Sequence, residues 1–127
     1  MIHAELTEKI IACAYRVYNK MGFGFLESVY EKCLTIELSK SGLRVETQKP
    51  ITVFYEGEIV GEFFSDILVN DTVILELKSV RKIAKAHEVQ LVNYLVTTGK
   101  EIGLLINFGE QKVEVKRKLR KLALAIL

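Results

Sequence analysis

Proline occurs once in this sequence of 127 residues, and tryptophan does not occur at all. Glycine contributes only 8 residues, and no internal repeat or low-complexity segment is present. The chain is therefore not a linker or a disordered tract. Half of its residues are hydrophobic and 27% are charged, which is the composition of a folded protein. The length suits one domain, and we expect residues 1–127 to form it.

Cysteine is scarce as well. Cys13 and Cys33 do not form the CxxC pair of zinc and redox motifs, so we expect two reduced thiols. No apolar run approaches the ~20 residues that cross a bilayer, and the N-terminus lacks the pattern of a signal peptide. These absences predict a cytoplasmic protein without a membrane partner. The closing LALAIL is expected to pack on the core or on a partner chain.

A large charge imbalance is also missing, since the net charge is +2 and the pI about 8.5. This balance neither implies nor excludes nucleic acid as a ligand. The segment KVEVKRKLRK near the C-terminus is strongly basic. It predicts either a local positive face or simply a solvated strand or helix edge.

The spacing of apolar residues changes along the chain from a helical period to a period of two. A buried strand, a helix and a second buried strand predict a crossover with parallel pairing, and the preceding hairpin makes the sheet mixed. The predicted class is α/β or α+β, in the order α-α-β-β-β-α-β-β. The predicted elements are helices over 4–20 and 26–42, a hairpin over 51–69 with its turn at 56–57, a strand over 72–80, a helix over 84–99 and strands over 101–108 and 112–118.

Two ionisable residues interrupt the apolar strand TVILELKSV. Glu76 and Lys78 point to the same face because side chains alternate along a strand. Asp66 lies on the preceding strand, and antiparallel pairing around the Asn70-Asp71 turn places it near Glu76. Two carboxylates and one lysine are therefore expected to converge at one end of the sheet.

This convergence has two interpretations. A structural ion pair at the sheet edge is the common one. The other is a metal site, because Mg²⁺ takes one or two carboxylates together with waters and phosphate oxygens. A metal placed there activates water and stabilises the charge of phosphoryl transfer, and Lys78 then steadies the water or the developing charge.

Asp66 followed by Glu76-Leu77-Lys78 resembles the motif of the PD-(D/E)xK nuclease superfamily, with Ser65 in the place of the motif's proline. The superfamily has an α-β-β-β-α-β core of restriction-endonuclease type, which matches the predicted order after the first helix. Two further patterns carry the resemblance: GFLESVY is similar to the G-x-x-E-x-x-Y signature of the GxxExxY family, and HEVQLVNYL to a Q-x-x-x-Y helix motif. The resemblance extends from about Leu6 to Arg120.

The resemblance implies a metal-dependent nuclease that uses Mg²⁺ or Mn²⁺. It implies a third carboxylate, Glu27, in the metal site, and Gly24 at a tight helix entry. The residues that it assigns are Glu27, Asp66, Glu76, Lys78 and Gln90 as catalytic, Glu27, Asp66, Glu76 and the Leu77 carbonyl as metal ligands, and Tyr30, His87 and Tyr94 as supporting groups.

The expected partner is nucleic acid, with DNA favoured over RNA. Lys116, Arg117 and Lys118 are the expected contacts to the phosphate backbone. A homodimer is a further expectation, with LALAIL and the first helix as candidate contacts. The alternatives are a non-catalytic nucleic-acid-binding or scaffold module on the same fold, and hydrolysis of a small phosphate ester.

Overall fold

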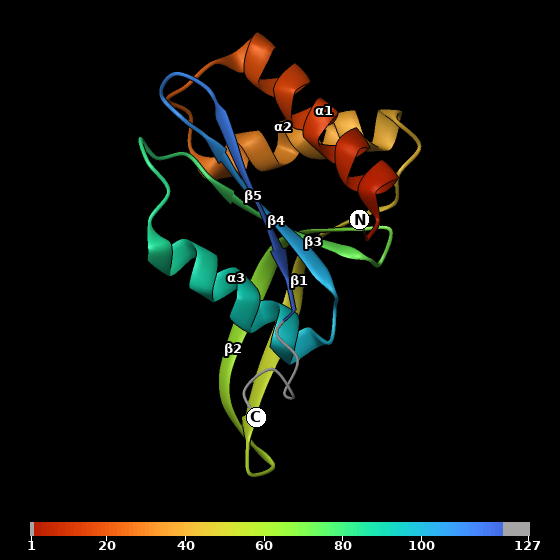
Figure 1. Ribbon diagram of the computed structural model, residues 1–127, viewed down its shortest axis with the longest axis vertical. Helices are drawn as coiled ribbons and strands as arrows, with labels where there is room; N and C mark the ends of the chain where they lie inside the picture. Colours follow the sequence, from red (N-terminus) through yellow and green to blue (C-terminus); the bar gives the residue numbers. More distant parts are fainter. Residues whose placement is uncertain (1, 121–127) are drawn as a thin grey trace.

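The computed structural model describes residues 2–120 and contains three helices and five strands in the predicted order (Figure 1). The restriction-endonuclease-like fold predicted from the sequence is confirmed. The elements are α1 (Ala4–Met21), α2 (Glu27–Lys40), β1 (Val45–Tyr55), β2 (Glu58–Val69), β3 (Val73–Lys78), α3 (Lys85–Thr98), β4 (Ile102–Phe108) and β5 (Val113–Leu119).

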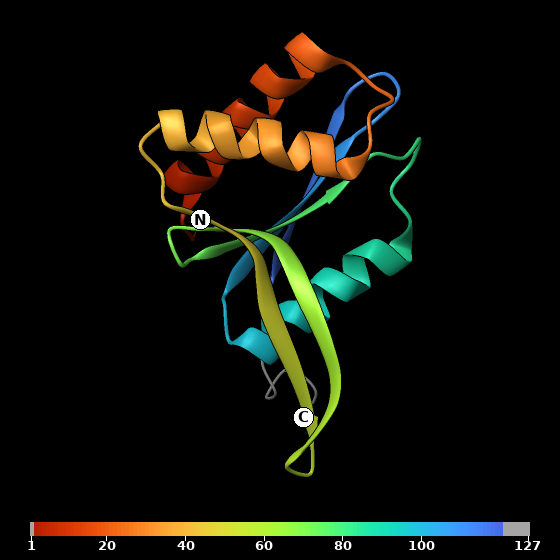
Figure 2. The same ribbon diagram turned by 180° about the vertical axis from the view of Figure 1, so that it is seen from behind.

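The five strands form one mixed sheet in the order β1-β2-β3-β4-β5. β3 and β4 are parallel, as the crossover through α3 predicted, and the other neighbours are antiparallel. Helices α1 and α2 lie on one face of the sheet and α3 on the other (Figures 1 and 2). Leu75 and Leu77 of β3 belong to the core under α1 and α2, whereas Ile74 packs with Leu91 and Leu95 of α3.

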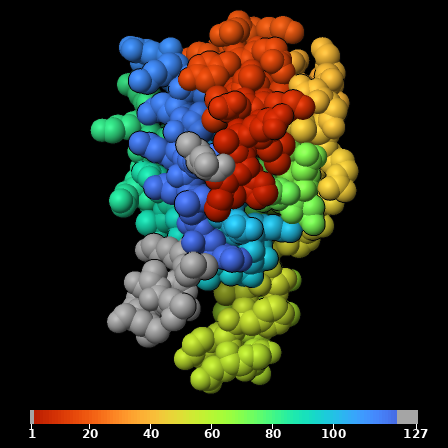
Figure 3. Space-filling view, turned by 45° about the vertical axis from the view of Figure 1, so that its right-hand side comes forward, coloured from red at the N-terminus to blue at the C-terminus, as the bar shows by residue number. Residues whose placement is uncertain are grey.

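The β1–β2 hairpin continues beyond the helices, and its far end stands clear of the body (Figures 2 and 3). β1 begins at Val45, earlier than the predicted start at Ile51. Residues 45–50, which the prediction left out of the strand, are mostly polar and exposed and end in Pro50. An edge strand tolerates such residues, because its outer side pairs with no other strand. Gln48, at φ 52°, interrupts the pairing of β1 with β2 opposite Asp66.

β2 and β3 pair over only a short stretch. The register runs from Val69↔Val73 to Ile67↔Leu75, and beyond that point β2 leaves β3 and continues into the hairpin. We call the opening between the two strands the fork. It lies beside Asp66 on β2 and beside Glu76, Leu77 and Lys78 on β3.

Three expectations from the sequence concern membrane-spanning helices, the C-terminal segment and the cysteines. Within residues 2–120, no helix is long and apolar enough to cross a bilayer. The predicted packing of LALAIL falls on residues 121–127, outside the described residues. Cys13 is buried and Cys33 half-buried, and both are free thiols.

Candidate metal and nucleic-acid site

A carboxylate bridges the two strands of the fork. Oδ2 of Asp66 accepts a hydrogen bond of 2.7 Å from the backbone N–H of Leu77. This bond replaces the ladder bond that β3 loses where β2 departs, so the N–H remains satisfied. The N–H and the C=O of one strand residue point to the same neighbour, and the Leu77 carbonyl therefore faces the fork as well.

Glu76 is the buried carboxyl group of the site. Its residue is only 6% exposed, and its Oε1 has no hydrogen-bond partner among the described residues. Burial and, after it, the negative charge of Asp66 raise the pKa of Glu76 to about 9, whereas the positive charge of Lys78 opposes the shift. A buried acceptor without a partner is costly, so this position is not explained by stability of the apo protein alone.

Lys78 is half-buried at the end of β3, in register with Asn107 of β4. Within residues 2–120 no carboxylate oxygen lies within ion-pair distance of its ammonium group. The simple ion pair that competes with the metal interpretation is therefore not formed. Asn107 is fully buried and secures the end of the strand, since its side chain accepts from the N–H of Val80 and donates to the Val80 carbonyl.

Helix α2 contributes a carboxylate that the sequence analysis missed. Glu31 is half-buried, and its Oε1 accepts a hydrogen bond of 2.7 Å from Gln48. Burial raises the pKa of Glu31, and the negative charge of Asp66 adds to the effect, while the bond from Gln48 opposes it. Glu31 therefore lies in the electrostatic range of the fork. Its position one helical turn after Glu27 was the available signal.

The predicted ligand Glu27 lies elsewhere on the same helix. It is exposed in the first turn of α2 and lines a surface pocket with Ser79, the residue that follows Lys78. The structure thus places Glu27 beside the end of β3, and it shows no direct contact of Glu27 with Asp66 or Glu76 among the described residues.

The other residues of the G-x-x-E-x-x-Y pattern position the loop between α1 and α2, residues 22–26. The Tyr30 hydroxyl donates to the Gly22 carbonyl, and its ring stacks on Phe108 with centroids 4.3 Å apart. The Ser79 hydroxyl donates to the Phe25 carbonyl at 2.9 Å. Gly24 has a φ of 115°, which only glycine adopts readily, and open space surrounds its Cα. Backbone conformation, not a close approach, therefore explains Gly24, and Tyr30 acts as an anchor.

Helix α3 presents Tyr94 toward the fork. Tyr94 is mostly buried, and burial, followed by the charges of Glu76 and Asp66, raises the pKa of its hydroxyl. Gln90 lies one turn earlier, is exposed, and lines the same groove as Tyr94. His87 lies at the start of the helix, where its Nδ1 accepts from the N–H of Ala84 at 3.1 Å. This bond gives His87 a structural task, whereas the charges of the carboxyl pair act on Tyr94.

The three basic residues of β5 point to both faces of the sheet. Arg117 donates to the Thr7 hydroxyl at 2.7 Å and to the Ile2 carbonyl, which ties β5 to α1. Lys118 forms an ion pair of 2.5 Å with Glu88 of α3. Lys116 is exposed. The predicted nucleic-acid contact of these three residues stays a prediction, and two of them already have partners within the protein.

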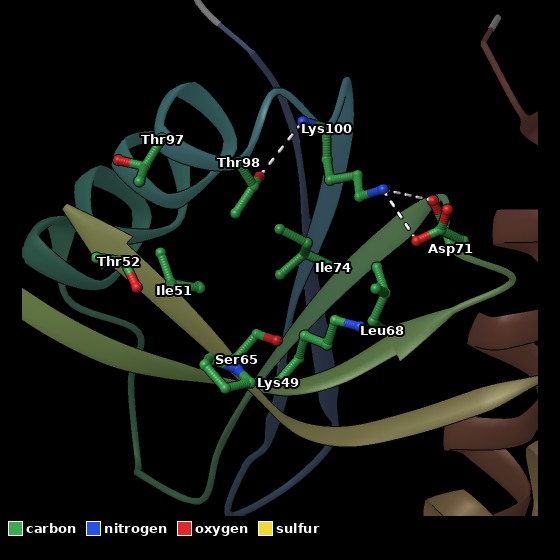
Figure 4. Close-up of a pocket in the computed structure, with 11 residues that line it drawn as sticks. Lys49, Ile51, Thr52, Ser65, Leu68, Asp71, Ile74, Thr97, Thr98 and Lys100 are labelled. Atoms are coloured by element: carbon green, nitrogen blue, oxygen red, sulfur yellow. Dashed lines mark hydrogen bonds and ion pairs between the residues drawn. The ribbon is translucent and has the colours of Figure 1, made fainter. Parts of the chain in front are cut away.

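A separate pocket of about 280 Å³ lies near the C-terminal end of α3 (Figure 4). It is lined by Lys49 and Lys100 together with hydroxyl side chains. The Lys100 ammonium bonds to Oδ1 of Asp71 at 3.0 Å, and Lys49 pairs with Glu46, so both charges are balanced. This pocket holds no buried carboxyl pair, and the fork is the better candidate for chemistry.

The donor set at the fork fits a hard divalent ion. Among residues 2–120 no group of three or more His, Cys, Asp or Glu side chains is placed so that it could hold a metal ion. Mg²⁺ does not require such a group, because it binds one or two carboxylates and keeps waters or phosphate oxygens. Asp66, the Glu76 oxygen that lacks a partner and the Leu77 carbonyl supply this type of incomplete oxygen set.

Comparison with curated proteins gave no match. Among solved structures, SSO0001 is similar with a TM-score of 0.60 and 18% identity, over 96% of this chain and 61% of that one. LHK-Exo in complex with dAMP is similar with a TM-score of 0.50 and 16% identity, over 94% and 85% of the two chains. LHK-Exo is described as an alkaline exonuclease from Laribacter hongkongensis in a second structure, whose TM-score is 0.42 at 14% identity.

At these identities the structural neighbours show the fold alone, and this chain spans only 61% of the length of SSO0001. The sequence comparison is more specific. Residues 4–118 match the family model of the PD-(D/E)XK nuclease superfamily, and the matched segment contains the fork and both helices beside it. Membership of the narrower GxxExxY family stays a prediction. The chain belongs to the PD-(D/E)XK nuclease superfamily.

Proposed function

We propose that the protein hydrolyses phosphodiester bonds of nucleic acid with the help of one or two Mg²⁺ or Mn²⁺ ions bound at the fork. The observation that carries the proposal is the buried Glu76 carboxyl group, which lies near the carboxylate of Asp66 and has an oxygen without a hydrogen-bond partner in the described part of the chain. A bound cation stabilises two neighbouring carboxylates strongly, because it offsets the repulsion between their negative charges. Nucleases of this superfamily generally use divalent metals.

Each group at the fork then has a role. Asp66, Glu76 and the Leu77 carbonyl hold the metal, and Asp66 also fixes the end of β3 through the Leu77 N–H. A bound divalent ion supplies charge stabilisation at the phosphoryl oxygens and lowers the pKa of a bound water. The ammonium of Lys78 orients the attacking water and stabilises the developing negative charge. Tyr94 and Gln90 line the side of the site on which the substrate binds.

Nucleic acid is the substrate class that the superfamily implies. LHK-Exo, which shares the fold, was solved with the nucleotide dAMP, and this agrees with a nucleotide ligand here. DNA in preference to RNA, a homodimer and a cytoplasmic location stay predictions.

The first test is a calorimetric titration of Mn²⁺ into the wild-type protein and the Asp66→Asn variant. We expect binding in the wild type and its loss in Asp66→Asn, whereas Asp71→Asn, which removes an exposed carboxylate paired with Lys100, should leave it unchanged. Repeating the titration near pH 7.5 in buffers of different ionisation enthalpy should reveal release of about one proton per site, because Glu76 must ionise to bind.

Absence of Mn²⁺ binding in the wild type at concentrations of about 1 mM would count against a metal site formed by the protein alone. It would favour the alternative of a binding module without turnover. Binding that survives in Asp66→Asn would place the metal away from the fork.

A second prediction separates the two carboxylates of α2. We expect Glu31→Gln to weaken Mn²⁺ binding about five-fold, because the charge of Glu31 acts on Asp66 and such a coupling is worth on the order of 1 kcal/mol. Glu27→Gln should change the affinity less than two-fold by the same measurement. The reverse order would support Glu27, the ligand that the family resemblance assigns.

A further inference from the structure

A groove runs between the β1–β2 hairpin and α3, and we call it the arm groove. Val53 and Phe63 line it from the hairpin, and Lys85, Gln90, Asn93 and Tyr94 are among the residues that line it from the helix. Its volume is about 780 Å³, within the range of sites that enclose small organic groups. Figures 1 and 2 show that the hairpin and α3 lie beside each other.

The hairpin side of the arm groove carries one aromatic ring, that of Phe63, next to Val53. Phe63 is 42% exposed, and its ring lies 5.6 Å from that of Tyr94 at an angle of 42°. Gly61, on the same face of β2, leaves room for this ring, since a Cβ there would meet Cε2 of Phe63 at 3.1 Å. The ring is thus held between the strand and Tyr94 while a large part of its surface remains open to a ligand.

The helix side combines apolar residues, among them Val89 and Val96, with polar ones. Gln90 and Asn93 are exposed amides, each with donors and acceptors, and Lys85 brings a positive charge. An aromatic plane opposite amide groups suits a flat ring with polar edges. A purely apolar partner would make no use of the hydrogen-bonding groups of these amides.

The arm groove is continuous with the candidate site through Tyr94. This residue lines the groove and lies close enough to Glu76 and Asp66 for their charges to act on its hydroxyl. A group bound against Tyr94 in the groove therefore lies on the side of α3 that is near the fork.

We propose that the arm groove receives an unpaired base of single-stranded nucleic acid, which stacks on Phe63 while its phosphate backbone passes the fork. The inference rests on the proposed function and narrows its substrate to single strands. A base within a duplex has both faces covered by its neighbours, so it must leave the stack before it can lie on a side chain.

The test is oligonucleotide binding in the presence of EDTA, which excludes turnover. The probes are a fluorescein-labelled single-stranded DNA of about 12 nucleotides and the same strand in a blunt duplex, followed by anisotropy at low salt. We expect the single strand to bind at least about ten-fold more tightly. Phe63→Ala should weaken it about 5- to 100-fold, the effect of one lost stacking platform.

Phe64→Ala is the matched control. Phe64 is the next residue of β2 and is even more exposed, but it points to the other side of the strand. It should change the affinity less than two-fold, and Phe63→Trp should retain tight binding. Phe63→Leu keeps apolar contact with Tyr94 without a stacking plane, so it should behave like Phe63→Ala even if the alanine variant is unstable.

The outcomes are separable from those for the proposed function. Equal affinity for single strand and duplex, equal effects of Phe63 and Phe64, or no binding of either probe at about 100 µM protein would overturn the inference, whether or not the protein cleaves. Loss of a dimer in Phe63→Ala, measured as a halved mass in solution, with unchanged DNA affinity would assign the groove to a second copy instead.

Discussion

Replacing Glu76 with Gln is expected to stabilise the metal-free protein at about pH 7.5 by on the order of 3 kcal/mol. The pKa of Glu76 is raised to about 9 in the folded protein, from 4.5 as the ordinary value. Between these two values the folded state keeps a proton that the unfolded state has lost. The wild-type free energy of unfolding must therefore fall as the pH rises.

The pH window follows from the two values. The stabilising contribution of the protonated carboxyl is fully present below about pH 4.5 and disappears as the pH rises through about 9. Glutamine has the same shape and no titration. Urea unfolding in EDTA between about pH 5 and pH 8.5 should therefore give a falling curve for the wild type and a flatter one for Glu76→Gln.

Glu58→Gln is the control for this experiment, because Glu58 is an exposed carboxylate near the hairpin turn. Its pH curve should follow that of the wild type. Mn²⁺ at saturation should stabilise the wild type most at high pH and Glu76→Gln hardly at all. Parallel pH curves for the wild type and Glu76→Gln would show that Glu76 is ionised in the folded protein, and the proposed electrostatics of the fork would be wrong.

The meeting of Asp66 and Glu76 could be predicted from the sequence because it depends on local rules. Strand alternation and the short turn at Asn70-Asp71 set the register, and the observed pair Ile67↔Leu75 confirms it. The fork could not be predicted in the same way. It depends on where β2 leaves β3, and beyond that point β2 pairs only with β1 of the long hairpin.

The site residues on the helices and on β5 show a second limit of prediction from the sequence. Glu27 was assigned through a motif, and this assignment stays a prediction. Glu31, one turn later, lies in the electrostatic range of Asp66. The sequence alone did not indicate Glu31, because tertiary packing decides which turn of α2 lies near the fork. The basic run of β5 was interpreted either as a local positive face or as a solvated edge. Alternation divides it between two faces, and contacts distant in sequence, from Arg117 to Thr7 and from Lys118 to Glu88, engage two of its residues.

Replacing Lys78 with Ala is expected to lower kcat for cleavage about 1,000-fold, the usual loss when one electrostatic group is removed from a transition state. The structure supports a large effect for a specific reason. Within residues 2–120 the ammonium has no carboxylate partner, so no existing ion pair has to be broken before it meets the phosphate or water. Lys9→Ala, on the exposed side of α1, is the matched control and should leave kcat unchanged.

Three measurements separate this role from a structural one. Lys78→Ala should retain Mn²⁺ binding, whereas Asp66→Asn should lose it, because only the second removes a ligand. KM should change much less than kcat, because the charge that Lys78 stabilises develops in the transition state. The midpoint of urea unfolding should stay close to that of the wild type, since the half-buried side chain has no ion pair with any other residue from 2 to 120. Cleavage by Lys78→Ala at the wild-type rate would leave the two carboxylates as a metal site and remove Lys78 from the mechanism.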